Sequence, residues 1–197
     1  MTAADTLALL DWKRRVFALY AAVRSMPGES GWELWRDTRD EMFRSHPQSP
    51  RPGYSGLAYY DYDPDARVLA ELEDIEAAPL AIETSGPEPM LFKPFARAHL
   101  TLCGEPLTLE LQWLESYGGG VFLSFRDATS GKGTYGGGRY LLDTVKGSDL
   151  GEEDGKLVLD FNFAYNPSCS YDPSWVCPLA PPANRLAVAV EAGELHG

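Results

Sequence analysis

The chain has 197 residues, of which 44% are hydrophobic and 12% aromatic, which is enough for one domain of ordinary size with a substantial core. Its formal net charge of -12 argues against nucleic-acid partners and anionic membrane surfaces, because both need a cationic surface. No apolar run is long enough to span a bilayer, and the basic residues at 13–15 follow the first apolar residues instead of preceding them as in a signal peptide. We therefore expect a cytoplasmic protein that forms a single domain over residues 1–197.

Two helices are expected in the N-terminal part, residues 1–46. Apolar side chains recur at spacings of three and four over residues 5–25, as in an amphipathic helix, and Met26-Pro27-Gly28 ends this pattern. Ser30 and Glu33 have the spacing of a capping box, in which each side chain accepts a hydrogen bond from the backbone of the other residue. We therefore expect the second helix to cover residues 31–45.

The rest of the chain, after a proline-rich connector at 46–53, changes to the alternating pattern of strands. The clearest alternation runs through residues 106–114, where one face carries Leu107, Leu109, Leu111 and Trp113. We expect these four side chains to face one core. Ten short segments have strand character, at 57–63, 67–76, 80–84, 90–95, 98–103, 106–114, 121–127, 139–145, 157–164 and 186–192. They indicate a mainly β fold, an antiparallel β-sandwich or barrel over 54–194, with two N-terminal α-helices packed on one end.

A glycine triplet at 136–138, followed by Arg139, is the first candidate for a binding site. Three glycines allow a close backbone approach and expose N–H donors, and a guanidinium group fits a carboxylate or phosphate. The alternative is a structural ion pair between Arg139 and an acidic residue, for which the sequence offers Asp127, Asp143 and Asp160. Both interpretations stay open at this point.

The strand expected at 157–164 would place Asp160 and Asn162 on the face opposite Leu159 and Phe161. On that face they would line either a polar cavity or an ordinary wet surface. The strand runs directly into the irregular loop at 165–167, which favours the cavity. We expect Arg139 to lie near Asp160, Asn162, Tyr165 or Asn166, facing this cavity.

Cys169 and Cys177 stand eight residues apart among several prolines, while Cys103 is expected to sit apart in a strand. We expect the first two thiols to lie close together. Three interpretations are open for them, namely buried thiols, a pair that can be oxidised, and catalysis. The three histidines have no spacing that would complete a zinc site with these thiols.

No cofactor or metal is expected. The pattern G-x-G-x-x-G at 131–136 lies between two expected strands and not between a strand and a helix, so it fails the context of a dinucleotide site. A serine triad is also absent, so acid–base chemistry would fall to carboxylates or tyrosines. The catalytic candidates are Asp160, Tyr165 and Cys169. Glu194 is a further acid near this region, although an exposed C-terminal carboxylate is the favoured interpretation.

Several segments together resemble a bacterial and archaeal family known as domain of unknown function 1684. They are TSGKGTYGGGRYLLD, DFNFAYNPSCSYDPSWVCPLAPPANRL, the AGE at 192–194, WRDTRDEMF at 35–43, Ser49-Pro50 and the Gly56-Leu57 step before Tyr59. The resemblance extends from about Leu9 to Glu194. It implies a β-rich fold and a site among these segments, and it implies no reaction. The family pattern falls on Thr129, Gly131, Thr134, Tyr135, Gly136, Gly138, Arg139, Tyr140, Asp143, Asp160, Asn162, Tyr165, Asn166, Cys169, Tyr171, Cys177, Pro178, Asn184 and Glu194.

Two functional hypotheses follow. The first is a protein that binds, or as an enzyme acts on, a small polar or anionic molecule of unspecified identity in a pocket around Arg139. Its ligand-binding residues would be Tyr135, Gly137, Gly138, Arg139, Asp160, Asn162, Tyr165 and Asn166. The second is a non-enzymatic structural or interaction protein, in which the same polar residues form a buried scaffold network. The oligomeric state is left open.

Overall fold

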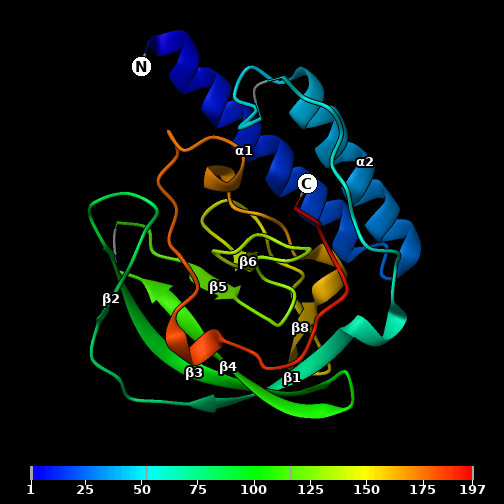
Figure 1. Cartoon of the computed structure of the whole chain (residues 1–197), viewed down its shortest axis with the longest axis vertical. Coiled ribbons are helices and arrows are strands. Elements are labelled where there is room, and N and C mark those ends of the chain that lie inside the picture. Colours follow the sequence, from blue (N-terminus) through cyan, green and yellow to red (C-terminus); the bar gives the residue numbers. More distant parts are fainter. Residues whose placement is uncertain (1, 52, 116, 197) are drawn as a thin grey trace.

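The computed structural model describes residues 2–51, 53–115 and 117–196, and it has two N-terminal helices followed by a curled antiparallel sheet (Figure 1). The sheet curls into a half-barrel on the side of the molecule opposite the helices. Irregular segments and short 3-10 turns fill the space between sheet and helices, and the last residues run from the sheet toward the helices (Figure 1). The mainly β fold with two N-terminal helices is therefore confirmed.

Helix α1 covers Ala3–Arg24 and helix α2 covers Glu29–Ser45. A capping box does occur, but at the start of α1, where the Thr2 side chain accepts from the Asp5 amide. The capping box predicted at Ser30 is wrong, because α2 starts two residues earlier from Gly28, which has a φ of 92° and forms no side-chain cap. The glycine turn already directs the chain along the helix axis, so Ser30 falls within the first helical turn.

The sheet has the strand order β6-β5-β4-β3-β1-β8-β7, with β2 paired to β3 outside this path, and every pairing between strands is antiparallel. The strands are β1 Arg67–Asp74, β2 Leu80–Ile82, β3 Met90–Leu102, β4 Glu105–Leu114, β5 Val121–Phe125, β6 Arg139–Asp143, β7 Glu152–Glu153 and β8 Lys156–Asp160. The two segments predicted at 90–95 and 98–103 join into the single long strand β3.

Two predicted strands are absent from the described residues. Segment 57–63 forms only an isolated bridge at Tyr59, and segment 186–192 belongs to no strand. Their backbones form isolated hydrogen bonds instead of a ladder. For example, the Leu186 amide donates to the Arg126 carbonyl at 2.7 Å. Alternating apolar residues bury one side of an extended chain whether or not a ladder partner lies beside it, which explains why the pattern was misleading here.

Cys103 also departs from its predicted place in a strand. It forms, with Gly104, the two-residue turn between β3 and β4, and both residues have positive φ, 53° and 76°. That conformation matches the tight hairpin turn whose twist suits the flanking strands. The Cys103 side chain is exposed at this turn.

A bulge in β3 changes which side chains of β4 face the core. Pro94 pairs with Gln112, but the next pair joins Ala96 to Leu111, so one residue of β3 has no partner. The alternation of β4 therefore reverses at this point. Gln112 is buried and Trp113 is 42% exposed, so the prediction that Trp113 shares a core face with Leu111 is wrong.

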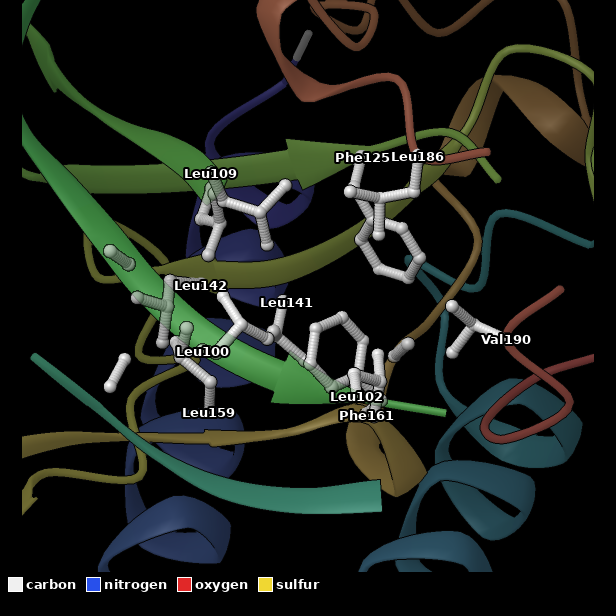
Figure 2. Packing of buried hydrophobic residues seen from close by; sticks show 14 of the residues in the cluster. Leu100, Leu102, Leu109, Phe125, Leu141, Leu142, Leu159, Phe161, Leu186 and Val190 are labelled. Carbon is white, nitrogen blue, oxygen red and sulfur yellow. The ribbon is translucent and has the colours of Figure 1, made fainter. Parts of the chain in front are cut away.

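Three clusters form the core. The first is aliphatic and lies in the hollow of the sheet, where Leu109, Leu141 and Leu159 meet the rings of Phe125 and Phe161 (Figure 2). The second is aromatic and lies between the helices and the sheet, and it contains Leu19, Tyr20, Val23, Trp32, Trp35 and Phe163. The third contains Ile82, Phe92, Phe122, Tyr140, Cys169 and Cys177. Burial of this apolar surface is the main favourable term for all three clusters, at about 25 cal/mol per Å².

Candidate functional site

Arg139, at the start of β6, is enclosed by protein on all sides, with a side chain that is 1% exposed. Its Nη2 lies 3.5 Å from Asp127 Oδ2 and donates to the Val190 carbonyl at 2.9 Å, while Nη1 donates to the Ala192 carbonyl. Asp127 in turn accepts from the Val190 amide at 2.7 Å. This geometry corresponds to the structural ion pair, and it fastens the C-terminal segment to the sheet.

Asp160 and Asn162 do not share the face of one strand as predicted. Strand β8 ends at Asp160, and residues 161–163 form a 3-10 turn that Asp160 caps by accepting from the Asn162 amide at 3.0 Å. The Asn162 Oδ1 accepts from the Asp63 amide at 2.9 Å, and the Asn162 Nδ2 donates to the Asp63 carbonyl at 2.7 Å. Burial raises the pKa of the Asp160 carboxyl, and the bonds from Asn162 oppose this. Neither residue contacts Arg139 through a hydrogen bond or ion pair.

Tyr165 and Asn166 lie in a different place, on the wall of a cavity beneath the two helices. The other walls come from α1, α2 and the turn around Ser148, so the cavity joins segments far apart in the sequence. Its volume is about 70 Å³, which suits a few water molecules or a ligand of a few non-hydrogen atoms. The lining residues are Trp12, Val16, Leu19, Tyr20, Trp35, Arg39, Met42, Phe43, Pro50, Tyr140, Lys146, Ser148, Tyr165, Asn166, Pro167 and Ser168.

Two cationic residues line this cavity, namely Lys146, which pairs with Asp143 at 3.2 Å, and Arg39 of α2. Its guanidinium carbon lies 4.9 Å from the ring centre of Trp35, 5.3 Å from Phe43 and 5.0 Å from Tyr165. Nη2 pairs with Glu194 Oε2 at 2.8 Å, and the Arg39 side chain stays 13% exposed. A guanidinium between aromatic faces is well suited to stacking and to binding an anion at its free edge.

Glu194 is buried, at 1% exposure, so its interpretation as an exposed C-terminal acid is wrong. Besides Arg39, its carboxylate accepts from the Asn166 amide at 2.9 Å and from the Tyr171 hydroxyl. The Asn166 Nδ2 donates to the Leu195 carbonyl at 2.9 Å. Asn166 lines the cavity, and its Oδ1 is buried and accepts no bond from the described residues, so this residue holds an acceptor without a partner.

Hydroxyl-bearing side chains also line the cavity. Trp35 Nε1 donates to the Tyr20 hydroxyl at 3.1 Å, and the Tyr165 hydroxyl lies 3.0 Å from Ser148 Oγ. Burial raises the pKa of the Tyr20 hydroxyl and that of the Tyr165 hydroxyl above the ordinary value of tyrosine. These phenols therefore keep their protons at neutral pH and act as hydrogen-bond donors, not as bases.

The two thiols of the irregular loop lie close together, as predicted. The Cys169 amide donates to Cys177 Sγ at 3.4 Å, and the Tyr135 hydroxyl lies 3.8 Å from Cys169 Sγ. Both cysteines are buried and unbridged. The pKa of the Cys169 thiol is lowered, because Cys177 donates a hydrogen bond to its sulfur and Ser85 and Tyr135 assist, with burial opposing the shift. Cys169 follows Ser168, the last residue of the cavity wall.

The structure thus divides the predicted site into separate places. Tyr165 and Asn166 lie at the cavity beneath the helices, Tyr135 lies beside Cys169, and Arg139 lies in its ion pair. Gly137 lines a second groove near β2, and Gly138 is packed under the stem of Arg126. Arg39, Tyr20 and Ser148 were not predicted. Only the segment at 35–43, which belongs to the family resemblance, gave a signal for Arg39.

Comparison with known families identifies the chain. The family model described as Protein of unknown function (DUF1684) matches residues 52–195. The chain belongs to this family. The DUF1684 match includes the irregular loop and Glu194 but not the two helices, although these supply half of the cavity wall.

One solved structure supports the same fold. It is the solution NMR structure of an uncharacterised protein of Haloarcula marismortui, which is 34% identical, with a TM-score of 0.60 over 84% of this chain and 92% of that chain. No curated protein matches the chain.

Within the described residues, no helix is both long and apolar enough to cross a membrane. Nor do residues 2–51, 53–115 and 117–196 contain a group of three or more metal-ligating side chains.

Proposed function

We propose that this DUF1684 protein binds a small polar or anionic molecule in the cavity beneath helices α1 and α2. The observation that carries the proposal is one cavity lined by a guanidinium group, tyrosines and Asn166, whose buried Oδ1 has no partner among the described residues. The pocket is therefore proposed around Arg39 and Asn166, and not around Arg139.

The chemistry of the walls narrows the ligand class. The guanidinium edge of Arg39 and the protonated hydroxyls of Tyr20 and Tyr165 offer positive charge and donors, which favours an oxyanion or a carbonyl oxygen. Asn166 Oδ1 requires a donor, such as a hydroxyl or amine, on the same ligand. A short hydroxy acid or amino acid has both groups within the available volume.

The test fills the cavity without touching its charges. Val16 lines the cavity from α1, so V16W should block it, whereas L10W places the same ring on an exposed part of α1 as a control. Melting temperature is measured with a panel of short hydroxy acids and amino acids. We expect a ligand that stabilises the wild type and L10W to have no effect on V16W, since a ligand at a hundred times its Kd adds about 2.7 kcal/mol.

The alternative is a scaffold network, and one observation favours it. Arg39 already has a buried carboxylate partner, and this pair joins α2 to the C-terminal segment. If no compound of the panel stabilises the wild type, the scaffold function is the one supported. The cytoplasmic location expected from the sequence remains part of the proposal, and cell fractionation tests it.

A further inference from the structure

A second groove lies between strand β2 and the segment at 179–182, and it shares no residue with the cavity beneath the helices. Its volume is about 380 Å³, within the range of small-molecule sites. The walls are largely apolar, with Ile82, Leu179 and Pro181 among them, and two arginines, Arg126 and Arg185, line the same space.

Arg126 and Arg185 are neighbours across two extended segments. They form an isolated parallel bridge, in which the Arg126 amide donates to the Asn184 carbonyl at 2.9 Å and the Leu186 amide donates to the Arg126 carbonyl at 2.7 Å. Side chains at paired positions of adjacent strands lie on the same side. The backbone therefore directs both arginine side chains to the same side, where both line the groove.

Neither guanidinium has a partner within the part of the chain that the structure describes, by hydrogen bond or by ion pair within 4.0 Å. Other arginines on the sheet do pair, as Arg67 does with Glu153 at 2.6 Å and Arg97 with Glu110 at 3.4 Å. Like charges that face each other across strands are destabilising. In a chain with 29 acidic and 17 basic residues, these two arginines thus remain available to an anion from outside.

The glycine triplet shapes the groove. A Cβ at Gly138 would lie 2.6 Å from the Phe125 carbonyl oxygen and 3.0 Å from Arg126 Cγ, so the glycine allows the stem of Arg126 to lie where it does. A Cβ at Gly137 would lie 3.2 Å from Leu179 Cδ2 and also too close to the Tyr135 ring. The close backbone approach that a glycine run permits is thus used beside Arg126, and not beside Arg139.

We propose that this groove binds a small organic carboxylate. The carboxylate lies between Arg126 and Arg185, and an apolar body packs against Ile82, Leu179 and Pro181. A guanidinium fork matches the planar carboxylate in a bidentate way. Glu83 also lines the groove, and its negative charge disfavours a dianion such as phosphate relative to a monoanion.

The experiment titrates the whole protein with benzoate and follows binding by isothermal titration calorimetry. R126Q and R185Q should each weaken benzoate binding about tenfold, equivalent to about 1.4 kcal/mol. R97Q, which removes an arginine elsewhere on the sheet, should leave the affinity unchanged, and so should V16W. Circular dichroism checks that each variant is folded.

Two other probes test the ligand class. Benzamide has the shape of benzoate without its charge, and inorganic phosphate has charge without an apolar body, so each should bind at least tenfold more weakly than benzoate. The proposal is overturned if benzamide or phosphate binds as tightly as benzoate, if R126Q and R185Q bind like R97Q, or if the wild type shows no saturable binding. Loss of benzoate binding in V16W would place the ligand in the cavity beneath the helices and would also overturn it.

Discussion

Two arginines, both removed from solvent to a large degree, differ in what surrounds them. Arg139 lies at the end of the aliphatic core, where Asp127 and two backbone carbonyls are the partners of its Nη1 and Nη2 groups. Arg39 lies in the aromatic region beneath the helices, with one carboxylate partner and three aromatic rings around it. The first arrangement leaves no room for a ligand, whereas the second opens onto a cavity.

The comparison teaches that a buried charge is not by itself evidence for a site. What separates the two regions is whether a cavity adjoins the charged group. Beside Arg39, the cavity is lined by Asn166, whose buried Oδ1 accepts no bond from the described residues. At Arg139 the unpartnered atom is its own Nε, which is enclosed and faces no described cavity.

The largest effect is expected for R139M. The substitution keeps most of the side-chain volume but leaves Asp127 charged and buried without its cation, so the free energy of unfolding should fall by about 3–5 kcal/mol. Urea denaturation measures this. The control is R97M, which breaks a half-exposed pair with Glu110 and should cost less than about 1 kcal/mol. Equal losses for the two variants would contradict the structural function of Arg139.

A smaller effect on stability is expected for R39M, because the Arg39 side chain is partly exposed and Glu194 keeps its bonds from Tyr171 and Asn166. We expect a loss of about 2–3 kcal/mol, within the range for removing one member of a buried polar pair. Unlike R139M, this variant should also lose any ligand response found for the cavity, as measured by calorimetry under folding conditions. A variant that unfolds less readily than the wild type, or that binds the ligand unchanged, would remove the distinction between the two regions.

The next prediction concerns the loop that forms one wall of the cavity. Oxidation with diamide should join Cys169 and Cys177, since the Cys169 amide nitrogen lies 3.4 Å from Cys177 Sγ, and a disulfide across this short loop adds roughly 2.5 kcal/mol on the chain-entropy model. Mass spectrometry and urea denaturation follow the bond and the stability. C103S serves as the background that excludes mixed pairs. Absence of the bond in C103S would show that the two sulfur atoms cannot reach each other.

The smallest effect is a difference in the pH dependence of alkylation. The lowered pKa of Cys169 means that its thiolate persists as the pH falls below the usual thiol range near 8.5, whereas partial burial raises the pKa of Cys103. Iodoacetamide labelling of C103S should therefore decline with falling pH at a lower pH than labelling of C169S. If labelling of C103S declines at the same pH as labelling of C169S, or at a higher pH, an activated thiol beside the cavity is ruled out.

The hydrophobic pattern predicted the elements where local and tertiary preferences agree. The helical stripe of α1 and the alternation of β4 up to Leu111 were correct for that reason. The bulge in β3 and the turn at Cys103 were not predicted, because both depend on how two strands align and not on either strand alone. The segment at 186–192 alternates like a strand, yet it is held by Asp127 and Arg139.

The sequence by itself determined the class of fold, the closeness of Cys169 to Cys177 and the identity of the family. The fold class follows from composition and periodicity and the closeness of the thiols from a short loop, which are properties of neighbouring residues, whereas the family follows from the resemblance of several segments to a known one. Only the tertiary structure decided which arginine faces a cavity, because the partners of Arg139 and Arg39 lie 12 to 155 residues away along the chain. A side chain's hydrogen bonds and its exposure are set by those distant partners, so no local pattern could separate the two.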